Sequence, residues 1–506
     1  MADDRHKKIS VLYASGRELQ VNEEFSSYLG KLLNADLSKQ TWDGMVSVPE
    51  FSVDEELKAL LETVVQRDRV SFDPQVRLQH SIGKSSPEIA RAMVYQLPTP
   101  VDAVVFPNDK ELRRLITVLK KENVRISIYG GGSSVTGGIR SKKYERAVCI
   151  DTSNLNDMEI GKGYCIAGSG LVGSEAERRL NAKGLTLGFF PESLEHSTIG
   201  GWISTKASGQ ESNAYGDIED IVIAVDLYRS DSTVIEGNCT RISSGVDGKD
   251  IATGGEGRNG IVVRARLKTF PLPAKRYFQS FLLPSFESGI DLMKTMERFP
   301  DVMRLMDETE TDLALNEAGD SLSKRILQRM MKSKGISRGS MVIIMSREKI
   351  AIPRVQGSIK MGQSPAVRWN ETRYQRPYLG NMLWKRSVVV DTLETSASWN
   401  DLAALYRNVK NEFALVTKEI GVSGLIMSHI SHEYQSGACI YFTFMFRSTN
   451  PVEDLDTIRD HIVQTFISSG GSITHHHGIG NEFRKYLSDG LKSIQDRVSD
   501  PVFLQV

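Results

Sequence analysis

The stretch Arg125-Ile126-Ser127-Ile128-Tyr129-Gly130-Gly131-Gly132-Ser133-Ser134 places three glycines and two serines directly after a predicted strand over residues 125–128. Glycine allows positive φ, and exposed N–H groups together with serine hydroxyls can hold an anion such as a pyrophosphate. Neither GxxxxGK(S/T) nor GxGxxG spacing occurs, so neither a triphosphate loop nor an ordinary dinucleotide fold is supported. Taken alone, the loop fits a tight structural turn equally well.

Predicted strands and helices alternate around this loop. Short apolar runs predict strands at residues 103–106, 147–151, 165–167, 221–228 and 260–267. Asn108 and Glu111 predict a capped helix whose inner face carries four apolar residues, and a second helix over residues 175–183 is expected to end at Gly184. Residues 185–220 are rich in small and turn-forming types, which suits backbone close to a bound ligand.

The rest of the chain mixes helices and strands. Residues 53–67 have helical spacing, and residues 271–273 (Pro-Leu-Pro) resemble a linker. Strands are predicted at residues 340–345 and 438–446, and helices at residues 398–420 and after Gly480. The pattern predicts an α+β protein of two large units with an N-terminal helical extension.

Composition excludes several classes of protein. The 506 residues are 40% hydrophobic and 25% charged, as in ordinary globular proteins. Lys+Arg and Asp+Glu both number 63, which argues against nucleic acid as a main partner. Cys149, Cys165, Cys239 and Cys439 lack CxxC spacing and indicate thiols in a reducing compartment. No apolar run spans a bilayer, and neither a secretory signal nor a peroxisomal Ser-Lys-Leu ending is present, so a cytoplasmic location is expected.

The histidine distribution points to chemistry. Six of the nine histidines lie between His429 and His477, and His475-His476-His477 form a triplet. Imidazole titrates near neutrality, and a triplet matches no capping or core pattern. In an extended segment His475 and His477 would share one side and His476 would oppose them, which disfavours a shared metal ion. His429 and His432 form another candidate metal pair, or line an active site.

Six segments together resemble one family. They are the glycine loop at 129–138, residues 191–202 (Pro-Glu-Ser-Leu-Glu-His-Ser-Thr-Ile-Gly-Gly-Trp), residues 205–209, residues 304–307, residues 437–442 (Gly-Ala-Cys-Ile-Tyr-Phe) and the histidine triplet. The chain is similar over residues 101–502 to the alkylglycerone-phosphate (alkyl-dihydroxyacetone-phosphate) synthases, a branch of the vanillyl-alcohol-oxidase group of FAD proteins.

The resemblance implies a domain organisation. It predicts an N-terminal helical extension at residues 1–96, a two-subdomain FAD-binding module at 97–273 and an α+β cap domain for the substrate at 274–455. A C-terminal helical segment at 456–506 would carry the triplet and close the active site. Because no histidine lies in the glycine loop, non-covalent FAD is expected.

The resemblance also implies which residues line the FAD. They are Ile128, Tyr129, Gly130, Gly131, Gly132, Ser133, Ser134, Glu192, Ser193, Leu194, Glu195, His196, Ser197, Thr198, Thr205, Lys206, Ala207, Ser208, Gly255, Glu256, Gly257, Gly260 and Ile261. The last segment departs from the family's usual Ser-Glu-Gly-Thr-Leu-Gly at Arg258 and Asn259, which puts flavin affinity in question.

The implied reaction joins a fatty alcohol to acyl-dihydroxyacetone phosphate and expels a fatty acid, which leaves an ether and involves no net redox change. A proton must leave C1, beside a ketone, and flavin would act as the electron sink. Tyr441 occupies the family's proton-transfer position, with His475, His476, His477 and Arg304 as further catalytic residues. A phenol has a pKa of about 10, so a shift of about three units, or roughly 4 kcal/mol, would be needed, and the histidines could supply it. Alternatively, Tyr441 is a core aromatic and Arg304 forms a surface ion pair with Asp301 or Asp307.

One departure concerns the substrate. The family's Tyr-Leu-Arg-Asp string, whose arginine holds the anionic head, reads Tyr378-Leu379-Gly380-Asn381 here. A lost charged contact is typically worth about 2–5 kcal/mol. Arg376, Lys385 or Arg386 could substitute.

Two alternative functions remain open. One is an FAD-linked 2-hydroxyacid dehydrogenase of the D-lactate type, although that class carries Glu-His-Gly where this chain has His476-His477-Gly478. The other is a diverged flavoprotein with weakened activity. The expected partners are the lipid substrates, with peripheral membrane contact and a homodimer both compatible with the sequence, although no strongly amphipathic basic helix is evident.

Overall fold

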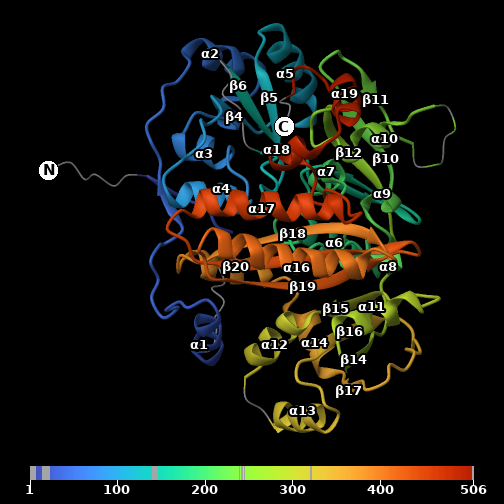
Figure 1. The fold of residues 1–506 in the computed structure, drawn as a ribbon. Coiled ribbons are helices and arrows are strands. Elements are labelled where there is room, and N and C mark those ends of the chain that lie inside the picture. The colour runs from blue at the N-terminus through green and yellow to red at the C-terminus, as the bar shows by residue number, and fades with distance from the viewer. Residues whose placement is uncertain are drawn as a thin grey trace.

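The computed structural model describes residues 7–13, 23–139, 146–238, 240, 243, 245–319 and 322–503. Three sheets carry the architecture. A four-stranded and a five-stranded sheet occupy the upper half of the view in Figure 1, and a seven-stranded sheet occupies the middle and lower part. This α+β arrangement confirms the predicted fold class.

The four-stranded sheet holds the start of the glycine loop. Its order is β3 (Val70–Ser71), β4 (Ala103–Val105), β6 (Ala147–Asp151) and β5 (Arg125–Tyr129), with β4, β5 and β6 parallel. Helix α5 (Asp109–Lys121) begins with the predicted capping box at Asn108 and Glu111 and buries its apolar face. Because β5 ends at Tyr129, the glycine loop emerges from the carboxyl edge of parallel strands, where ligands commonly bind.

The five-stranded sheet is antiparallel. Its order is β11 (Val234–Ile235), β10 (Val222–Tyr228), β12 (Ile261–Lys268), β8 (Tyr164–Gly168) and β7 (Met158–Ile160). Its core includes residues of α6 (Gly173–Asn181) and α7 (Ile199–Thr205). The predicted linker begins within a short strand, β13 (Phe270–Pro271), which pairs with β9 (Leu185–Thr186).

The seven-stranded antiparallel sheet supplies the other side of the site. Its order is β17 (Ile359–Gly362), β14 (Tyr277–Leu283), β16 (Ser340–Ser346), β15 (Val302–Met306), β19 (Gly424–Glu433), β20 (Gly437–Phe446) and β18 (Val389–Ser398). Helices α11 (Phe286–Lys294), α16 (Leu402–Glu419) and α17 (Pro451–Ser468) pack against it and contribute to one large core.

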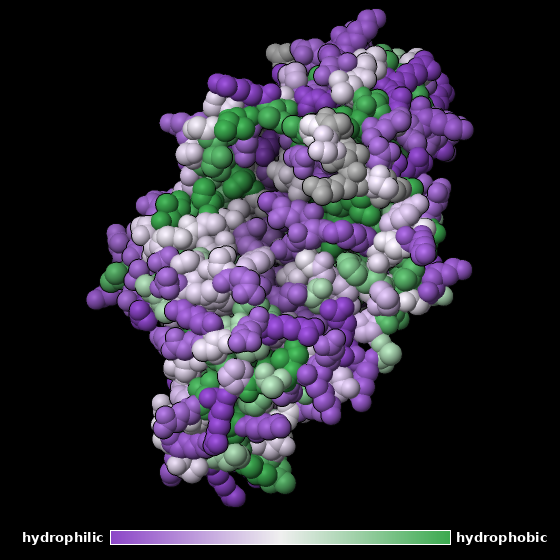
Figure 2. Space-filling view, turned by 90° about the vertical axis from the view of Figure 1, so that its right-hand side faces the viewer, coloured by the Kyte–Doolittle hydropathy of each residue, from purple (hydrophilic) through white to green (hydrophobic). Residues whose placement is uncertain are grey.

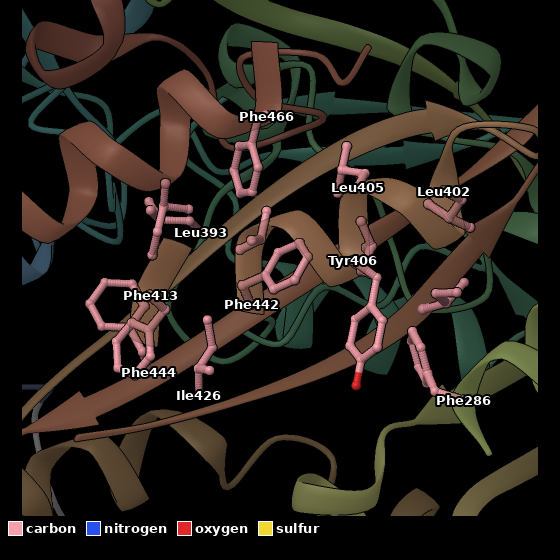
Figure 3. Close-up of a cluster of buried hydrophobic side chains, with 14 of the residues drawn as sticks. Phe286, Leu393, Leu402, Leu405, Tyr406, Phe413, Ile426, Phe442, Phe444 and Phe466 are labelled. Atoms are coloured by element: carbon pink, nitrogen blue, oxygen red, sulfur yellow. The ribbon is translucent and has the colours of Figure 1, made fainter. Parts of the chain in front are cut away.

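Figure 3 shows this core, where Phe442 and Phe444 of β20 point toward helix side chains. The Phe442 and Phe466 rings are 5.5 Å apart, and the Phe413 and Phe444 rings are 5.8 Å apart. Since successive strand residues face opposite sides, Tyr441 is directed to the other face of the sheet.

The remaining elements flank these sheets. They are β1 (Lys8–Ser10), β2 (Met45–Ser47), α1 (Glu23–Leu32), α2 (Glu55–Val64), η1 (Arg67–Arg69), α3 (Pro74–Gln79), α4 (Ser86–Met93), α8 (Ser212–Tyr215), α9 (Ile218–Ile221), α10 (Gly248–Ala252), α12 (Glu308–Glu317), α13 (Leu322–Ser333), α14 (Ser364–Thr372), α15 (Arg376–Trp384), α18 (Gly480–Phe483), η2 (Arg484–Tyr486) and α19 (Asp489–Val498).

Two observations bear on the expected domain boundaries. The N-terminal segment contributes β3 to the four-stranded sheet, and α4 packs against α17 and β18. Helix α17 runs across the boundary expected at residue 455.

Figure 2 shows one face of the molecule, where hydrophilic residues predominate and hydrophobic residues gather in small areas. In the described part of the chain, no helix is both long and apolar enough to cross a membrane. Cys149, Cys165 and Cys439 are buried free thiols, whereas Cys239 and the chain ends at 1–6 and 504–506 lie outside the described residues.

Candidate active site

A cavity of about 300 Å³ lies where the sheets converge. Its wall takes residues from the glycine loop, from the segment 191–210, and from strands β15, β19 and β20. Segments distant in sequence therefore meet at one site.

Glycine is required where the loop meets the segment 196–198. A Cβ on Gly131 would lie 1.7 Å from the carbonyl oxygen of His196, and a Cβ on Gly130 would lie 2.4 Å from Thr198 Oγ1. Gly132 has φ of 66°. Only glycine lets the loop lie this close while Ser133 and Ser134 reach the cavity.

Most of the predicted flavin-lining residues line this cavity. They are Ile128, Gly130, Gly131, Gly132, Ser133, Ser134, Glu192, Ser193, Ser197, Thr198, Thr205, Ala207, Ser208, Glu256 and Gly257. The predicted catalytic residues Arg304, Tyr441, His476 and His477 line it as well.

The other predicted residues have different contacts. Tyr129 packs on His80, and Leu194 and Ile261 are buried in hydrophobic clusters. His196 and Glu195 contact the Tyr378 hydroxyl, and Lys206 pairs with Glu219 at 2.7 Å. Gly255 and Gly260 flank the turn at residues 256–259, which contains Glu256 and Gly257. His475 contacts Tyr434.

The departures at Arg258 and Asn259 have structural uses. Arg258 is buried and its Nη2 lies 3.1 Å from Glu256 Oε2, while the Asn259 amide donates to the carbonyl of Ile251. Glu256 also accepts the N–H of Gly480 at 2.8 Å. These contacts join the cavity wall to the segment that follows the triplet.

The cavity is suited to a large polar ligand. Ser169 Oγ, both polar side-chain atoms of Gln210 and Nε of Arg304 are buried with no hydrogen-bond partner among the described residues, and all three residues line the cavity. Buried polar groups are nearly always paired, so a polar ligand is the natural partner. The hydroxyl-rich glycine loop adds donors for a phosphate-bearing group.

Tyr441 is held by three imidazoles. Its ring stacks on His429, with centroids 4.4 Å apart and planes 16° apart, because the two residues are paired across β19 and β20. Its hydroxyl oxygen lies 2.9 Å from His432 Nε2 and 3.4 Å from His476 Nε2. His432 has φ of 58° at a register shift in β19, an uncommon conformation that places its ring at the phenol.

A hydrogen-bonded chain continues from His476 to a carboxylate. His476 Nδ1 lies 3.0 Å from His475 Nδ1, and His475 Nε2 lies 2.7 Å from the Tyr434 hydroxyl. That hydroxyl donates to Asp217 Oδ2 at 2.7 Å.

The partners assign the protons in this chain. Since Tyr434 donates to Asp217, it accepts from His475 Nε2. With its one proton on Nε2, the imidazole tautomer of His475 accepts from His476 at Nδ1. His476 Nε2 is left as the acceptor of the Tyr441 proton. The phenol oxygen in turn accepts a hydrogen bond from Nε2 of His432. Nδ1 of the same ring accepts one from Ser212 Oγ at 2.7 Å.

Glu394 organises the triplet. Its carboxylate accepts the backbone N–H groups of His475, His476 and His477 at 2.6, 3.1 and 3.2 Å. The triplet therefore lies in a bend around a buried carboxylate, and not in the extended arrangement considered from sequence. Burial opposes ionisation of Glu394, but His477, His475 and these hydrogen bonds hold its pKa below the usual value.

Two observations argue against a metal-binding site in the same region. Glu394, Cys439, His475 and His476 each offer a ligand atom, and these atoms lie within 4.8 Å of one another. However, both Glu394 oxygens already accept hydrogen bonds. Burial also raises the pKa of the Cys439 thiol well above its usual value, so the thiol stays protonated, and metals bind the thiolate.

From sequence, the histidines were expected to lower the pKa of Tyr441, and the structure indicates the opposite shift. Burial is the main cause that raises the pKa of Tyr441 well above its usual value, and the nearby Glu394 carboxylate adds to it. Burial also lowers the pKa of His429 to about 4 and lowers the pKa values of His432 and His476 well below the usual range. These three imidazoles are therefore neutral and cannot supply positive charge to the phenol.

Arg304 is not part of a surface ion pair. It is buried, and its Nη2 lies 2.8 Å from Glu310 Oε1 and 3.1 Å from His429 Nδ1. Asp301 and Asp307 pair instead with Arg347 and Lys410. The guanidinium is a fixed positive group at the cavity wall.

Of the three basic residues considered for the missing arginine, Arg376 adjoins a residue of this wall. Its Nη2 is 3.9 Å from Glu310 Oε1, and the adjacent Pro377 lines the cavity. Arg386 donates instead to the carbonyls of Leu37 and Met382. A Cβ on Gly380 would meet only Val390, at 3.9 Å, so the helix has room for a side chain there.

The structure adds residues that the sequence did not single out. Tyr13 lines the cavity, and Asn381 clamps its backbone through bonds of 3.3 and 3.0 Å. His429 and His432, considered earlier as cavity lining or as a metal pair, do line the cavity. Asp217 and Tyr434 lie in unremarkable sequence, and only the clustering of histidines near Tyr434 gave any signal.

Comparison with known proteins agrees with this architecture. The FAD binding domain family matches residues 101–238, and the C-terminal domain family of FAD linked oxidases matches residues 272–492. The alkyldihydroxyacetonephosphate synthase of Dictyostelium discoideum is 31% identical, covering 87% of this chain and 76% of the relative. The synthase of Trypanosoma brucei brucei is 28% identical, covering 95% and 87%.

A solved structure of an alkyldihydroxyacetonephosphate synthase superimposes with a TM-score of 0.79 at 26% identity, covering 94% of this chain and 92% of that chain. The matched families identify FAD as the cofactor of this chain.

Proposed function

Because the chain belongs to the alkyldihydroxyacetonephosphate synthase family of FAD-dependent enzymes, we propose that it exchanges the acyl group of acyl-dihydroxyacetone phosphate for a fatty alcohol. The products are an ether-linked ketone phosphate and a fatty acid. The observation that carries the proposal is the Tyr441 phenol, which lies on the cavity wall within hydrogen-bond distance of two imidazoles. A phenol so placed can exchange a proton with a carbon beside a ketone.

The residues of the glycine loop and of segments 192–198 and 205–208 that line the cavity would hold the FAD, with loop N–H groups and hydroxyls at its pyrophosphate. Bound FAD supplies an electron sink for the carbanion beside the ketone, without net redox change. No histidine lies in the glycine loop, which supports non-covalent attachment.

Tyr441 would act through a relay. The C1 proton moves onto the phenol oxygen while the phenol's own proton moves to His476 Nε2. The Nδ1 proton of His476 can pass to His475, the Nε2 proton of His475 to Tyr434, and the Tyr434 proton to Asp217. A free phenolate, which burial disfavours, is thereby avoided.

His432 and His477 would assist different steps. His432 donates an Nε2–H hydrogen bond to the phenol oxygen and so orients the other lone pair, which would receive the C1 proton. His477 lines the cavity, and its Nδ1 lies 3.3 Å from Glu394, an arrangement that leaves Nε2 as an acceptor for the alcohol proton.

Arg376 would hold the anionic head of the substrate. It lies one helical turn before Gly380, on the same face of α15, and Arg304 already pairs with Glu310. Arg376, whose carboxylate neighbour Glu310 lies 3.9 Å away, is better placed to bind a phosphate than Arg304, which contacts the same carboxylate at 2.8 Å.

The test is turnover by purified protein. With acyl-dihydroxyacetone phosphate and a long-chain alcohol, we expect an ether product and fatty acid in equal amounts, while the flavin absorbance stays that of the oxidised form. Bleaching of the flavin by a 2-hydroxyacid, without ether formation, would refute the proposal and favour a dehydrogenase.

A further inference from the structure

We propose that α13 is a docking surface for an anionic lipid bilayer. This helix carries an exposed apolar row beside a basic row, a combination that the sequence alone did not reveal. The inference rests on the helix itself and does not depend on the reaction proposed above.

The outer face of α13 is hydrophobic where solvent would be expected. Leu322, Ile326 and Met330 are 75%, 47% and 39% exposed, and their spacing of four residues places them along one side. The inner face is already used, because Leu327 is buried and Met331 packs against the same cluster. The outer row therefore cannot serve the core of this chain.

Positive charge is concentrated on the same helix. Residues 322–334 contain Lys324, Arg325, Arg329, Lys332 and Lys334 and no acidic residue, although the whole chain has no net formal charge. Within the described part of the chain, Arg329 and Lys332 have no carboxylate partner. Arg325, Arg329 and Lys332 form a row adjacent to the apolar one, as in helices that lie in a membrane interface.

The position of α13 suits a flat partner. Figure 1 shows it at the lower extremity of the molecule, beyond β17, which it contacts. Because its inner face is packed, only the outer face of α13 is open to a partner. Two copies meeting through α13 would bring like charges together, which disfavours self-association. Anionic headgroups match the basic row, and acyl chains match the apolar row.

The surface is also connected to the cavity. The cluster beneath α13 includes Trp369, which lines the cavity. Docking through α13 would therefore place a bilayer one hydrophobic layer from the site.

A matched control exists on α19. Leu491 and Ile494 are 50% and 60% exposed, but that helix carries equal numbers of acidic and basic residues, with Asp489 and Asp496 opposed to Lys492 and Arg497. It offers an exposed apolar pair without a net charge.

The experiment is vesicle flotation of the full-length flavoprotein. Vesicles of phosphatidylcholine alone are compared with vesicles in which phosphatidylserine replaces part of it. We expect binding to the anionic vesicles, weakened by salt, and a loss of roughly tenfold or more in Arg329→Glu/Lys332→Glu and in Leu322→Ser/Ile326→Ser. The variant Leu491→Ser/Ile494→Ser should bind like the parent protein.

Three outcomes would overturn the inference. The first is that the parent protein does not bind anionic vesicles, and the second is that the α13 variants bind them as well as the parent does. The third is that the parent forms an oligomer, the α13 variants do not, and neither binds vesicles. Unchanged flavin absorbance establishes that each variant is folded. Vesicle binding without ether formation in the parent protein would refute the proposed reaction and leave the docking surface intact.

Discussion

At the scale of single residues, a tyrosine base needs a fixed oxygen and a group that takes its own proton, and different side chains meet these two requirements. Tyr441 is stacked on His429 and hydrogen-bonded to His432 and His476, so its oxygen is fixed. The same burial raises its pKa, so the phenol cannot ionise alone. The chain through His476, His475 and Tyr434 to Asp217 gives the proton a place to go.

Replacing Tyr441 tests this arrangement. Tyr441→Phe should lower ether formation by about 10²–10⁴-fold, the usual contribution of a positioned acid or base, while the flavin absorbance is retained. The control is Tyr406→Phe, which removes another buried phenol, one that contacts Asp307 outside the cavity, and should keep its turnover. Equal turnover in Tyr441→Phe and the parent protein would remove Tyr441 from the reaction.

Glu433 gives a pH-dependent prediction. Burial raises its pKa to about 8, whereas an unfolded glutamate titrates near about 4.3. Between these values the folded state holds a proton that the unfolded state lacks, so this contribution to stability falls as the pH rises. The free energy of unfolding of Glu433→Gln minus that of the parent should therefore rise with pH, by up to about 1.4 kcal/mol per pH unit, and level off near pH 8.

Urea unfolding at a series of pH values measures this difference. Glu453→Gln, on the exposed side of α17, serves as the control and should show no such rise. A pH-independent difference for Glu433→Gln would show that Glu433 does not hold a proton in the folded state.

At the scale of elements, three strands and the bend of the triplet place the groups around Tyr441. In β20, Ile440 and Phe442 face the helices while Tyr441 faces the cavity. The register shift in β19 brings His432 to the phenol, and Glu394 of β18 gathers the N–H groups of the triplet.

Removing the charge of Glu394 should loosen the triplet. A glutamine has one acceptor oxygen and an amide that cannot accept an N–H, so Glu394→Gln leaves at least one buried donor unpaired. We expect a stability loss of about 1–3 kcal/mol and a larger loss of turnover than the stability change explains. The matched control is Glu412→Gln, whose carboxylate contacts His461 away from the cavity. Full turnover in Glu394→Gln would contradict the anchoring role.

Helix α15 tests the anion site. Arg376→Ala should raise the KM for the phosphate-bearing substrate by about tenfold or more. Gly380→Arg should lower it, and should also stabilise α15, because a glycine inside a helix costs about 1 kcal/mol. An unchanged KM in both variants would place the phosphate elsewhere.

At the scale of the whole molecule, the site exists because three sheets converge on one cavity. Short-range patterns were sufficient for many elements: the capping box at Asn108 and Glu111 begins α5 as predicted, and the glycine loop follows β5. The serines and glycines of the cavity wall were predictable because the wall needs backbone freedom and small side chains there.

Other features depend on tertiary contacts and could not be predicted from sequence. Glu394 is 81 residues from His475, and nothing local marks it as the anchor. Tyr13 reaches the cavity only because Asn381 holds its backbone. The raised pKa of Tyr441 follows from its burial among side chains that are distant in sequence. The exposed row on α13 depends on which of its two apolar faces is packed.

The central claim, proton removal beside a ketone, is tested most directly with acyl-dihydroxyacetone phosphate deuterated at both C1 positions. The protein is incubated with this substrate and a fatty alcohol in ordinary water, and the deuterium content of the ether product is measured by mass spectrometry. We predict that the product has lost one of its two C1 deuterons to solvent. An ether product that retains both would contradict removal of a C1 proton with exchange at the Tyr441 oxygen.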